Sequence, residues 1–359
     1  MSSSQVRCEA NLFTSAILNS GKKELAPYRA LINLVKVRID FVHFSFENRC
    51  EIWFRFSNLQ ELPFPNSFIN PEIEAIQHLW DGFSKREIKE FSDIKKPSYV
   101  YSLPDHSLFI SSFLTDEVLY VKDSRDSSSQ VLTFAKGHGL DGPWGIAVDS
   151  DFVYIASFTT DQIHKYEKVS GRFISVFGNE NELDCPEGMA FGPNKTLYVA
   201  SFLNDQVVKY TQEGQYLGVV ADQSKGLKGP EGVAFLRNGT LLVSSHYTDN
   251  VIMLDPVTGI FLGEFAHVEK PVGIITGLDG HVYVTSYVTN SVMRFNGKTG
   301  KFIDVFASSD GLRGPSSISF ADSRSLYCAS YDNDKIILFN STSGVSLSLY
   351  SKELKPRGI

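Results

Sequence analysis

The chain has 359 residues, of which 42% are hydrophobic, enough for one large core or two modest ones. This composition indicates a folded globular protein rather than a disordered one. No stretch approaches the ~18 consecutive apolar residues that a membrane-spanning helix needs, so the sequence predicts no membrane span.

The formal net charge of −7 is unevenly divided. Residues 1–97 carry 13 basic and 12 acidic side chains, which leaves 21 basic and 29 acidic side chains for the rest. The larger part is therefore acidic and lacks the overall positive charge that binding to backbone phosphates needs. We therefore do not expect nucleic acid as a partner.

Residues 1–94 are expected to form an N-terminal extension of mixed helix and strand. Residues 24–34 are compatible with a helix, residues 39–46 and 51–56 predict a β-hairpin, and residues 72–91 predict an amphipathic helix. Residues 1–23 carry three basic side chains and one acidic one, as organelle transit peptides do. The interpretation we favour is a cytoplasmic chain, with organelle targeting as the alternative.

A repeat begins after this extension. Prolines recur at positions 97, 143, 186, 230, 271, 315 and 356, which gives spacings of 46, 43, 44, 41, 44 and 41 residues. A period of this length corresponds to one four-stranded blade of a β-propeller. Residues 97–359 therefore predict an all-β propeller domain of antiparallel blades.

Four strands can be assigned within each repeat. In the third repeat they cover 187–191, 196–202, 206–211 and 215–221, with Gly, Pro and Asn in the short turns between them. The second strands of the other repeats are expected at 108–113, 153–158, 241–246, 282–287 and 326–331.

The repeat carries a recognisable pattern. It reads Pro-x-Gly-Ile-Ala, then Leu-Tyr-Val-Ala-Ser, then Asp-Gln-Val-x-Lys-Tyr, then Thr-Gly-x-Phe-x-x-x-Phe. This pattern resembles the NHL repeat and its relatives among six-bladed propellers, over residues 97–355. The resemblance implies the propeller fold; it does not imply one activity, because such propellers include scaffolds, binders of RNA, carbohydrate and protein, and several unrelated enzymes.

Six full repeats fit between Pro97 and Ser351. Residues 355–359 open a seventh unit, so the alternatives are six blades or a seventh composed of the C-terminus and the predicted hairpin. With either number of blades, the ring must close so that no edge strand is left unpaired. We favour six blades.

Two variable positions are expected to meet at one end of the ring, here called the rim. The residue between Pro and Gly is Trp144, Glu187, Glu231, Val272, Ser316 or Arg357. The residue after the recurring Ser is Phe113, Phe158, Phe202, His246, Tyr287 or Tyr331. We take as candidates for ligand binding the residues whose side chains differ from those at the same position of other repeats, together with two tyrosines: Trp144, Glu187, Glu231, His246, Tyr287, Tyr331 and Arg357.

The carboxylates Glu187 and Glu231 also raise the hypothesis of a calcium or magnesium site, because these cations prefer oxygen ligands. Lactonase-type and lyase-type propellers, which this fold resembles, hold one metal with acidic, Asn or His residues from several blades. Val272 and Ser316 stand where further ligands would be needed. His246 could act as a base or ligand, although a hydrogen-bonded substitute for Phe or Tyr is the simpler interpretation.

Other recurring polar residues are interpreted as structural. A two-residue element, Thr or Asn followed by Asp or Asn, comes after the second strand in all six units. We expect its short polar side chains to accept hydrogen bonds from the backbone of their own loop. The recurring Ser112, Ser157, Ser201, Ser245, Ser286 and Ser330 are interpreted in the same way rather than as nucleophiles.

The sequence therefore favours a non-enzymatic interaction or scaffold protein that binds a protein or peptide segment, or another ligand, on the rim. No cofactor is expected under this interpretation. The alternative is a metal-dependent lyase or lactonase-like enzyme with Glu187, Glu231 and His246 at the central channel.

Overall fold

The computed structural model describes residues 39–44, 52–56, 94–124, 131–179, 181–308 and 311–350. The chain divides into two compact units, Met1–Ser84 and Lys85–Ile359. In the first unit, β1 (Ile39–Phe44) pairs antiparallel with β2 (Ile52–Phe56), where a hairpin was expected. The two expected helices, residues 24–34 and 72–91, lie outside the described residues. Within the described ranges no helix has the length and apolar character of a membrane crossing.

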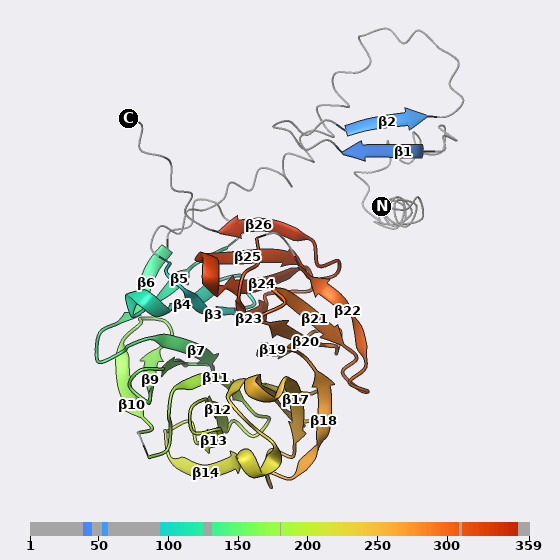
Figure 1. Ribbon diagram of the computed structural model, residues 1–359. Helices are drawn as coiled ribbons and strands as arrows, with labels where there is room; N and C mark the ends of the chain where they lie inside the picture. The colour runs from blue at the N-terminus through green and yellow to red at the C-terminus, as the bar shows by residue number, and fades with distance from the viewer. Residues whose placement is uncertain are drawn as a thin grey trace. The chain divides into compact units, whose positions relative to one another are not determined.

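The second unit is a ring of six four-stranded antiparallel sheets, so the expected propeller of six blades is confirmed (Figure 1). Blade 1 contains β3 (Pro97–Ser102), β4 (Leu108–Ser112), β5 (Glu117–Val121) and β6 (Val131–Lys136). Blade 2 contains β7 (Pro143–Val148), β8 (Phe152–Ser157), β9 (Gln162–Glu167) and β10 (Phe173–Phe177). Blade 3 contains β11 (Pro186–Phe191), β12 (Leu197–Ser201), β13 (Gln206–Tyr210) and β14 (Tyr216–Ala221).

The remaining blades repeat this order. Blade 4 contains β15 (Pro230–Phe235), β16 (Leu241–Ser245), β17 (Asn250–Leu254) and β18 (Phe261–His267). Blade 5 contains β19 (Pro271–Thr276), β20 (Val282–Ser286), β21 (Ser291–Phe295) and β22 (Phe302–Ala307). Blade 6 contains β23 (Pro315–Phe320), β24 (Ser325–Ser330), β25 (Lys335–Asn340) and β26 (Ser346–Tyr350). Four 3-10 turns lie between strands: η2 (Phe113–Thr115), η3 (Gln223–Lys225), η4 (His246–Thr248) and η5 (Tyr331–Asn333).

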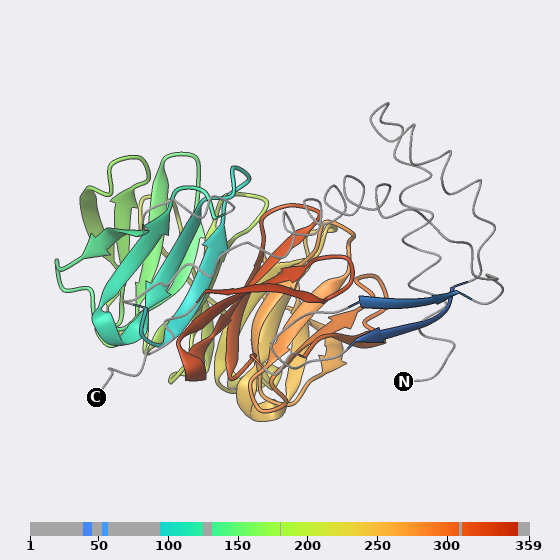
Figure 2. The same cartoon turned by 90° about the horizontal axis from the view of Figure 1, so that it is seen from above.

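The first strand of each blade lies at the centre of the ring and the fourth at its periphery (Figure 1). Figure 2 shows the same ring from the side, where the strands of neighbouring blades lie next to one another. The central strands pack in the order β3, β7, β11, β15, β19, β23 and back to β3. The ring is therefore closed by six blades, and the alternative of a composite seventh blade is wrong.

The hydrophobic core is divided into six clusters, one between each pair of neighbouring blades. The cluster that closes the ring joins Tyr327 and Ile336 of blade 6 to Val100 and Leu108 of blade 1. All four of these side chains are fully buried. Apolar burial therefore stabilises the closing interface in the same way as the other five.

The glycine of Pro-x-Gly is required by close packing at the centre. A β-carbon on Gly145 would lie 1.9 Å from the backbone oxygen of Glu187 in the next blade. A contact this short cannot be accommodated without moving one of the two central strands. The glycine therefore helps to fix the position of Glu187.

A hydrogen bond from one blade to the next recurs six times and is here called the clasp. An Asp or Asn after the second strand accepts from a backbone N–H of the following blade at 2.6–3.0 Å. The pairs are Asp116 with Gly142, Asp161 with Cys185, Asp205 with Gly229, Asp249 with Lys270, Asn290 with Gly314, and Asp334 with Lys96.

The expectation that these residues bind their own loop is therefore wrong. Both partners of each clasp have a positive φ, between 44° and 60°, and these left-handed turns bring the carboxylate or amide oxygen against the neighbouring blade. Asp and Asn adopt this conformation more readily than most residues. The recurring serines do bind within their own blade: Ser112, for example, accepts a hydrogen bond from Lys95 N at 2.9 Å.

Candidate functional site

The rim forms as the sequence predicts. In every blade the proline that opens the first strand is the register partner of the serine that ends the second strand. The loop that precedes the proline and the loop that follows the serine therefore lie at the same end of the ring. The structure places six of the seven candidate residues at this end, and the seventh, Arg357, lies outside the described residues.

Two carboxylates of adjacent blades stand at the centre of the rim. Glu187 on β11 is 3% exposed and Glu231 on β15 is 7% exposed. His246, the first residue of η4, is close to the second carboxylate, with its Nδ1 at 2.5 Å from Glu231 Oε1. Glu187 Oε2 has no hydrogen-bond partner among the residues that the structure describes.

Burial determines the protonation of this acidic pair. Burial raises the pKa of Glu187 well above its ordinary value, and the nearby Glu231 raises it further. Burial also raises the pKa of Glu231, although the hydrogen bond and the charge of His246 oppose the increase. Because the two carboxylates repel each other, a proton or a bound cation is needed to relieve the pair.

Aromatic side chains from blades 6, 1 and 2 form the opposite side of the rim. The Trp144 ring lies 5.5 Å from Phe113, 5.5 Å from Phe158 and 5.6 Å from Tyr331, between centroids. All four rings are only partly buried. Lys96 Nζ lies 4.8 Å from the centre of the Tyr331 ring, within the range of a cation–π contact.

The two tyrosines link the aromatic and acidic sides. Burial and the nearby Asp332 raise the pKa of Tyr331, and Glu187 contributes to this increase. Burial and a hydrogen bond with Asp332 raise the pKa of Tyr287 to about 12, with a smaller contribution from Glu231. The tyrosines and the carboxylates come from blades 3 to 6 and lie at the same end of the ring.

A narrow cavity opens at the centre of the ring. Its lining includes Trp144, Glu231, Val272 and Ser316, which occupy the same position in four blades. The cavity volume is about 10 Å³, which accommodates about one water molecule. A cavity of this size has room for one small polar group but not for a substrate as large as a sugar ring.

The donor set does not fit a calcium or magnesium ion. Such ions take six or more oxygen ligands. The candidate residues provide two carboxylates and one imidazole, and Val272 has no donor in its side chain. The hydroxyl of Ser316 donates to Pro97 O at 3.1 Å, as structural residues of the ring do.

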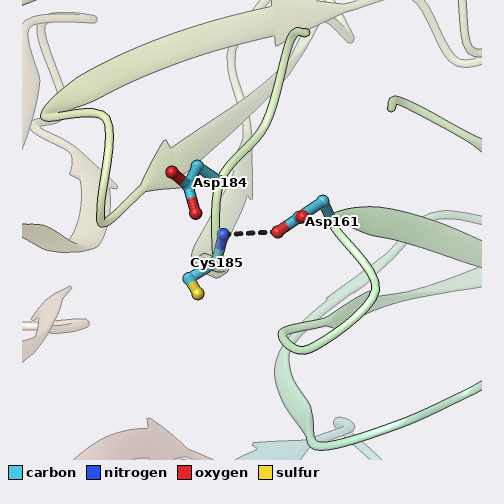
Figure 3. Close-up of side chains that lie close together, drawn as sticks. All are labelled: Asp161, Asp184 and Cys185. Atoms are coloured by element: carbon cyan, nitrogen blue, oxygen red, sulfur yellow. Dashed lines mark hydrogen bonds between the residues drawn. The ribbon is translucent and has the colours of Figure 1, made fainter. Parts of the chain in front are cut away.

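A second group of potential ligands, Asp161, Asp184 and Cys185, is explained by the clasp (Figure 3). Asp161 Oδ1 accepts the backbone N–H of Cys185 at 2.8 Å, which is the clasp between blades 2 and 3. Burial, with the neighbouring carboxylates, raises the pKa of the Cys185 thiol to about 12, so it stays protonated.

Exposed apolar residues on the rim were missed from the sequence. In four blades the residue after the aromatic position is large, apolar and more than half exposed: Leu114, Leu203, Tyr247 and Val288. Tyr247 also contacts Phe202, with 5.6 Å between ring centroids. The signal was present, because these residues share one position in the repeat.

No protein-family model and no curated protein matches the sequence. Solved structures that match include the six-bladed propellers of a lyase, a gluconolactonase and nidogen. The likeness is one of fold.

Streptogramin B lyase matches with a TM-score of 0.57 and 15% identity, over 75% of this chain and 87% of that one. A putative gluconolactonase matches with a TM-score of 0.56 and 15% identity, over 67% and 87%. A structure of the nidogen/laminin complex matches with a TM-score of 0.55 and 18% identity, over 62% and 83%. These neighbours include enzymes and a protein-binding module, so the fold alone does not determine the activity. The narrower resemblance to NHL repeats stays a prediction.

Proposed function

We propose that the protein is an interaction propeller that binds a protein segment across the rim. The observation that carries the proposal is the combination of half-buried aromatic rings around Trp144 with the exposed apolar residues Leu114, Leu203, Tyr247 and Val288. Together these residues are here called the rim surface. Aromatic anchors and exposed apolar groups on one face are typical of protein-binding sites.

Two further features support this function. The rim is built from loops on a rigid ring, an arrangement that suits recognition. The cavity holds about one water molecule, so a ligand larger than a side-chain tip must lie across the rim rather than inside the channel. From the repeat pattern we also propose kinship with NHL-like interaction propellers.

The test is selection from a displayed library of random peptides on the full chain. We expect enriched peptides whose binding falls at least tenfold in Leu203→Asp and Val288→Asp, because a buried charge in an apolar contact is costly. The matched control is Val169→Asp, since Val169 is 94% exposed in the turn between β9 and β10, at the other end of its blade. Failure to enrich peptides, or equal loss in the control variant, would contradict the proposal.

The contact between Glu231 and His246 at 2.5 Å favours a second candidate, the metal-dependent lyase or lactonase-like enzyme. A carboxylate beside an imidazole is a common arrangement for moving a proton. The short set of metal donors weighs against it. A thermal shift with calcium, magnesium, manganese or zinc that is lost in the Glu187→Ala/Glu231→Ala double variant would favour this enzyme over the interaction protein.

A further inference from the structure

The acidic pair lacks a cation for one of its members. Glu231 lies next to His246. Glu187 is only 3% exposed, and its Oε2 has no hydrogen-bond partner among the described residues. An ionised carboxylate that is buried and unpaired is strongly unfavourable. This side chain therefore remains protonated until a cation is provided.

Three lysines of the rim form ion pairs with other carboxylates. Lys96 Nζ lies 3.0 Å from Asp332, and Lys270 Nζ lies 3.4 Å from Asp249. Lys95 Nζ lies 3.2 Å from Asp334 in the clasp that closes the ring. No described ion pair joins any of these lysines, or another cationic side chain, to Glu187, so we look for its cation in a ligand.

The size of the cavity limits the kind of cation. The cavity is lined by Glu231 and by Gly188, the residue after Glu187. Its volume of about 10 Å³ matches a group as large as one water molecule. A primary ammonium is compact and carries three donors, whereas a guanidinium is a wide planar group. A divalent ion would need more oxygen ligands than the pair offers. The cavity therefore favours a primary ammonium.

The surroundings suit the rest of a lysine side chain. Trp144 lines the same cavity as Glu231 and presents an apolar ring next to Tyr331. Lysine buries its alkyl stem along apolar surfaces while its charge seeks a polar partner. The aromatic side of the rim can therefore cover the stem while the acidic side receives the head.

We propose that the mouth of the ring binds the primary ammonium of a lysine in the bound segment, between Glu187 and Glu231, with the alkyl stem against Trp144. This inference rests on the proposed function, because it names the side chain by which a segment on the rim is anchored. Binding ionises Glu187 and releases its proton. Affinity therefore increases as the pH rises.

The first experiment uses n-butylammonium chloride as the probe, with thermal melts of the full chain at pH 8 against sodium chloride of equal concentration. At ten times the dissociation constant we expect the melting temperature to rise by about 3 °C. The rise should disappear in Glu187→Gln and remain in Glu213→Gln, whose carboxylate is exposed in the turn between β13 and β14. n-Butylguanidinium should produce a smaller rise.

Three results of these melts would overturn the inference. They are the absence of a rise with n-butylammonium, an equal rise in Glu187→Gln, and a rise with calcium or magnesium alone. The last result would assign the acidic pair to a metal.

The selected peptides separate this inference from the proposed function. Replacement of their lysine by norleucine should reduce affinity at least tenfold for the wild-type protein, and much less for Glu187→Gln. Peptides that bind the rim surface without a required lysine would overturn the ammonium site and leave the interaction function standing. If no peptide binds the rim surface, the proposed function fails, and the n-butylammonium melts still decide the ammonium site.

Discussion

The clasp between the last blade and the first predicts how strongly closure of the ring depends on one carboxylate. Asp334 Oδ1 accepts the backbone N–H of Lys96 at 2.8 Å, and its φ is 58°. Asp334→Ala removes a hydrogen bond to a charged group, worth about 1.5–3 kcal/mol. It also places alanine in the left-handed region, at a cost of about 1 kcal/mol. We therefore expect the free energy of unfolding to fall by about 3 kcal/mol.

The matched control is Asp334→Asn, because blade 5 uses Asn290 for the same clasp at 2.8 Å. Asparagine keeps the acceptor oxygen and tolerates a positive φ. It loses the ion pair with Lys95, which is exposed and contributes about 1 kcal/mol or less, and the negative charge that strengthens the hydrogen bond. Equilibrium unfolding in urea, followed by circular dichroism, measures both variants. Equal losses in the two variants, or a negligible loss in Asp334→Ala, would refute this account of the clasp.

Three further predictions concern the centre of the ring and its core. Gly145→Ala should destabilise the protein by several kcal/mol in urea unfolding, because the new β-carbon would clash with the backbone of Glu187. The control is Gly226→Ala, which should cost only about 1 kcal/mol because Gly226 has a positive φ and open space around it. Burial raises the pKa of Glu187, so its contribution to stability is lost as the pH rises above about 4.5. Glu187→Gln should therefore raise the melting temperature at pH 8 and leave it unchanged at pH 4. A rise in melting temperature at pH 4 but not at pH 8 would contradict this prediction. Burial lowers the pKa of His164 to about 4, with a smaller contribution from the charge of His138. The free energy of unfolding should therefore fall by about 3 kcal/mol as the pH drops from 6.5 to 4. Melts of His164→Val across that range should not show this loss.

The sequence predicted the blades well because hydrophobic periodicity and turn residues act locally. In the third blade the predicted second strand, 196–202, corresponds to β12 at Leu197–Ser201. The six repeats also provided an internal alignment, from which the meeting of Glu187, Glu231 and His246 at one rim could be predicted. From the sequence, six blades could be favoured over seven but not established, because closure of the ring depends on packing between residues more than two hundred positions apart.

Other features required the folded structure. The clasp was assigned to the wrong backbone, because sequence shows that an Asp recurs but not which neighbouring N–H its left-handed turn faces. The 2.5 Å contact between Glu231 and His246 depends on side-chain rotamers. The close approach of the central strands at Gly145 and Glu187 depends on how neighbouring blades pack. These are tertiary effects that local propensity does not encode.

The most direct test of the account uses the fluorescence of Trp144. The chain has three tryptophans, Trp53, Trp80 and Trp144, so Trp53→Phe/Trp80→Phe leaves one reporter at the mouth. The account predicts that a selected peptide containing lysine changes the emission of Trp144 in proportion to occupancy, and that the change weakens in Glu187→Gln. Peptide binding that leaves the emission of Trp144 unchanged would contradict the claim that the mouth of the ring is the binding site.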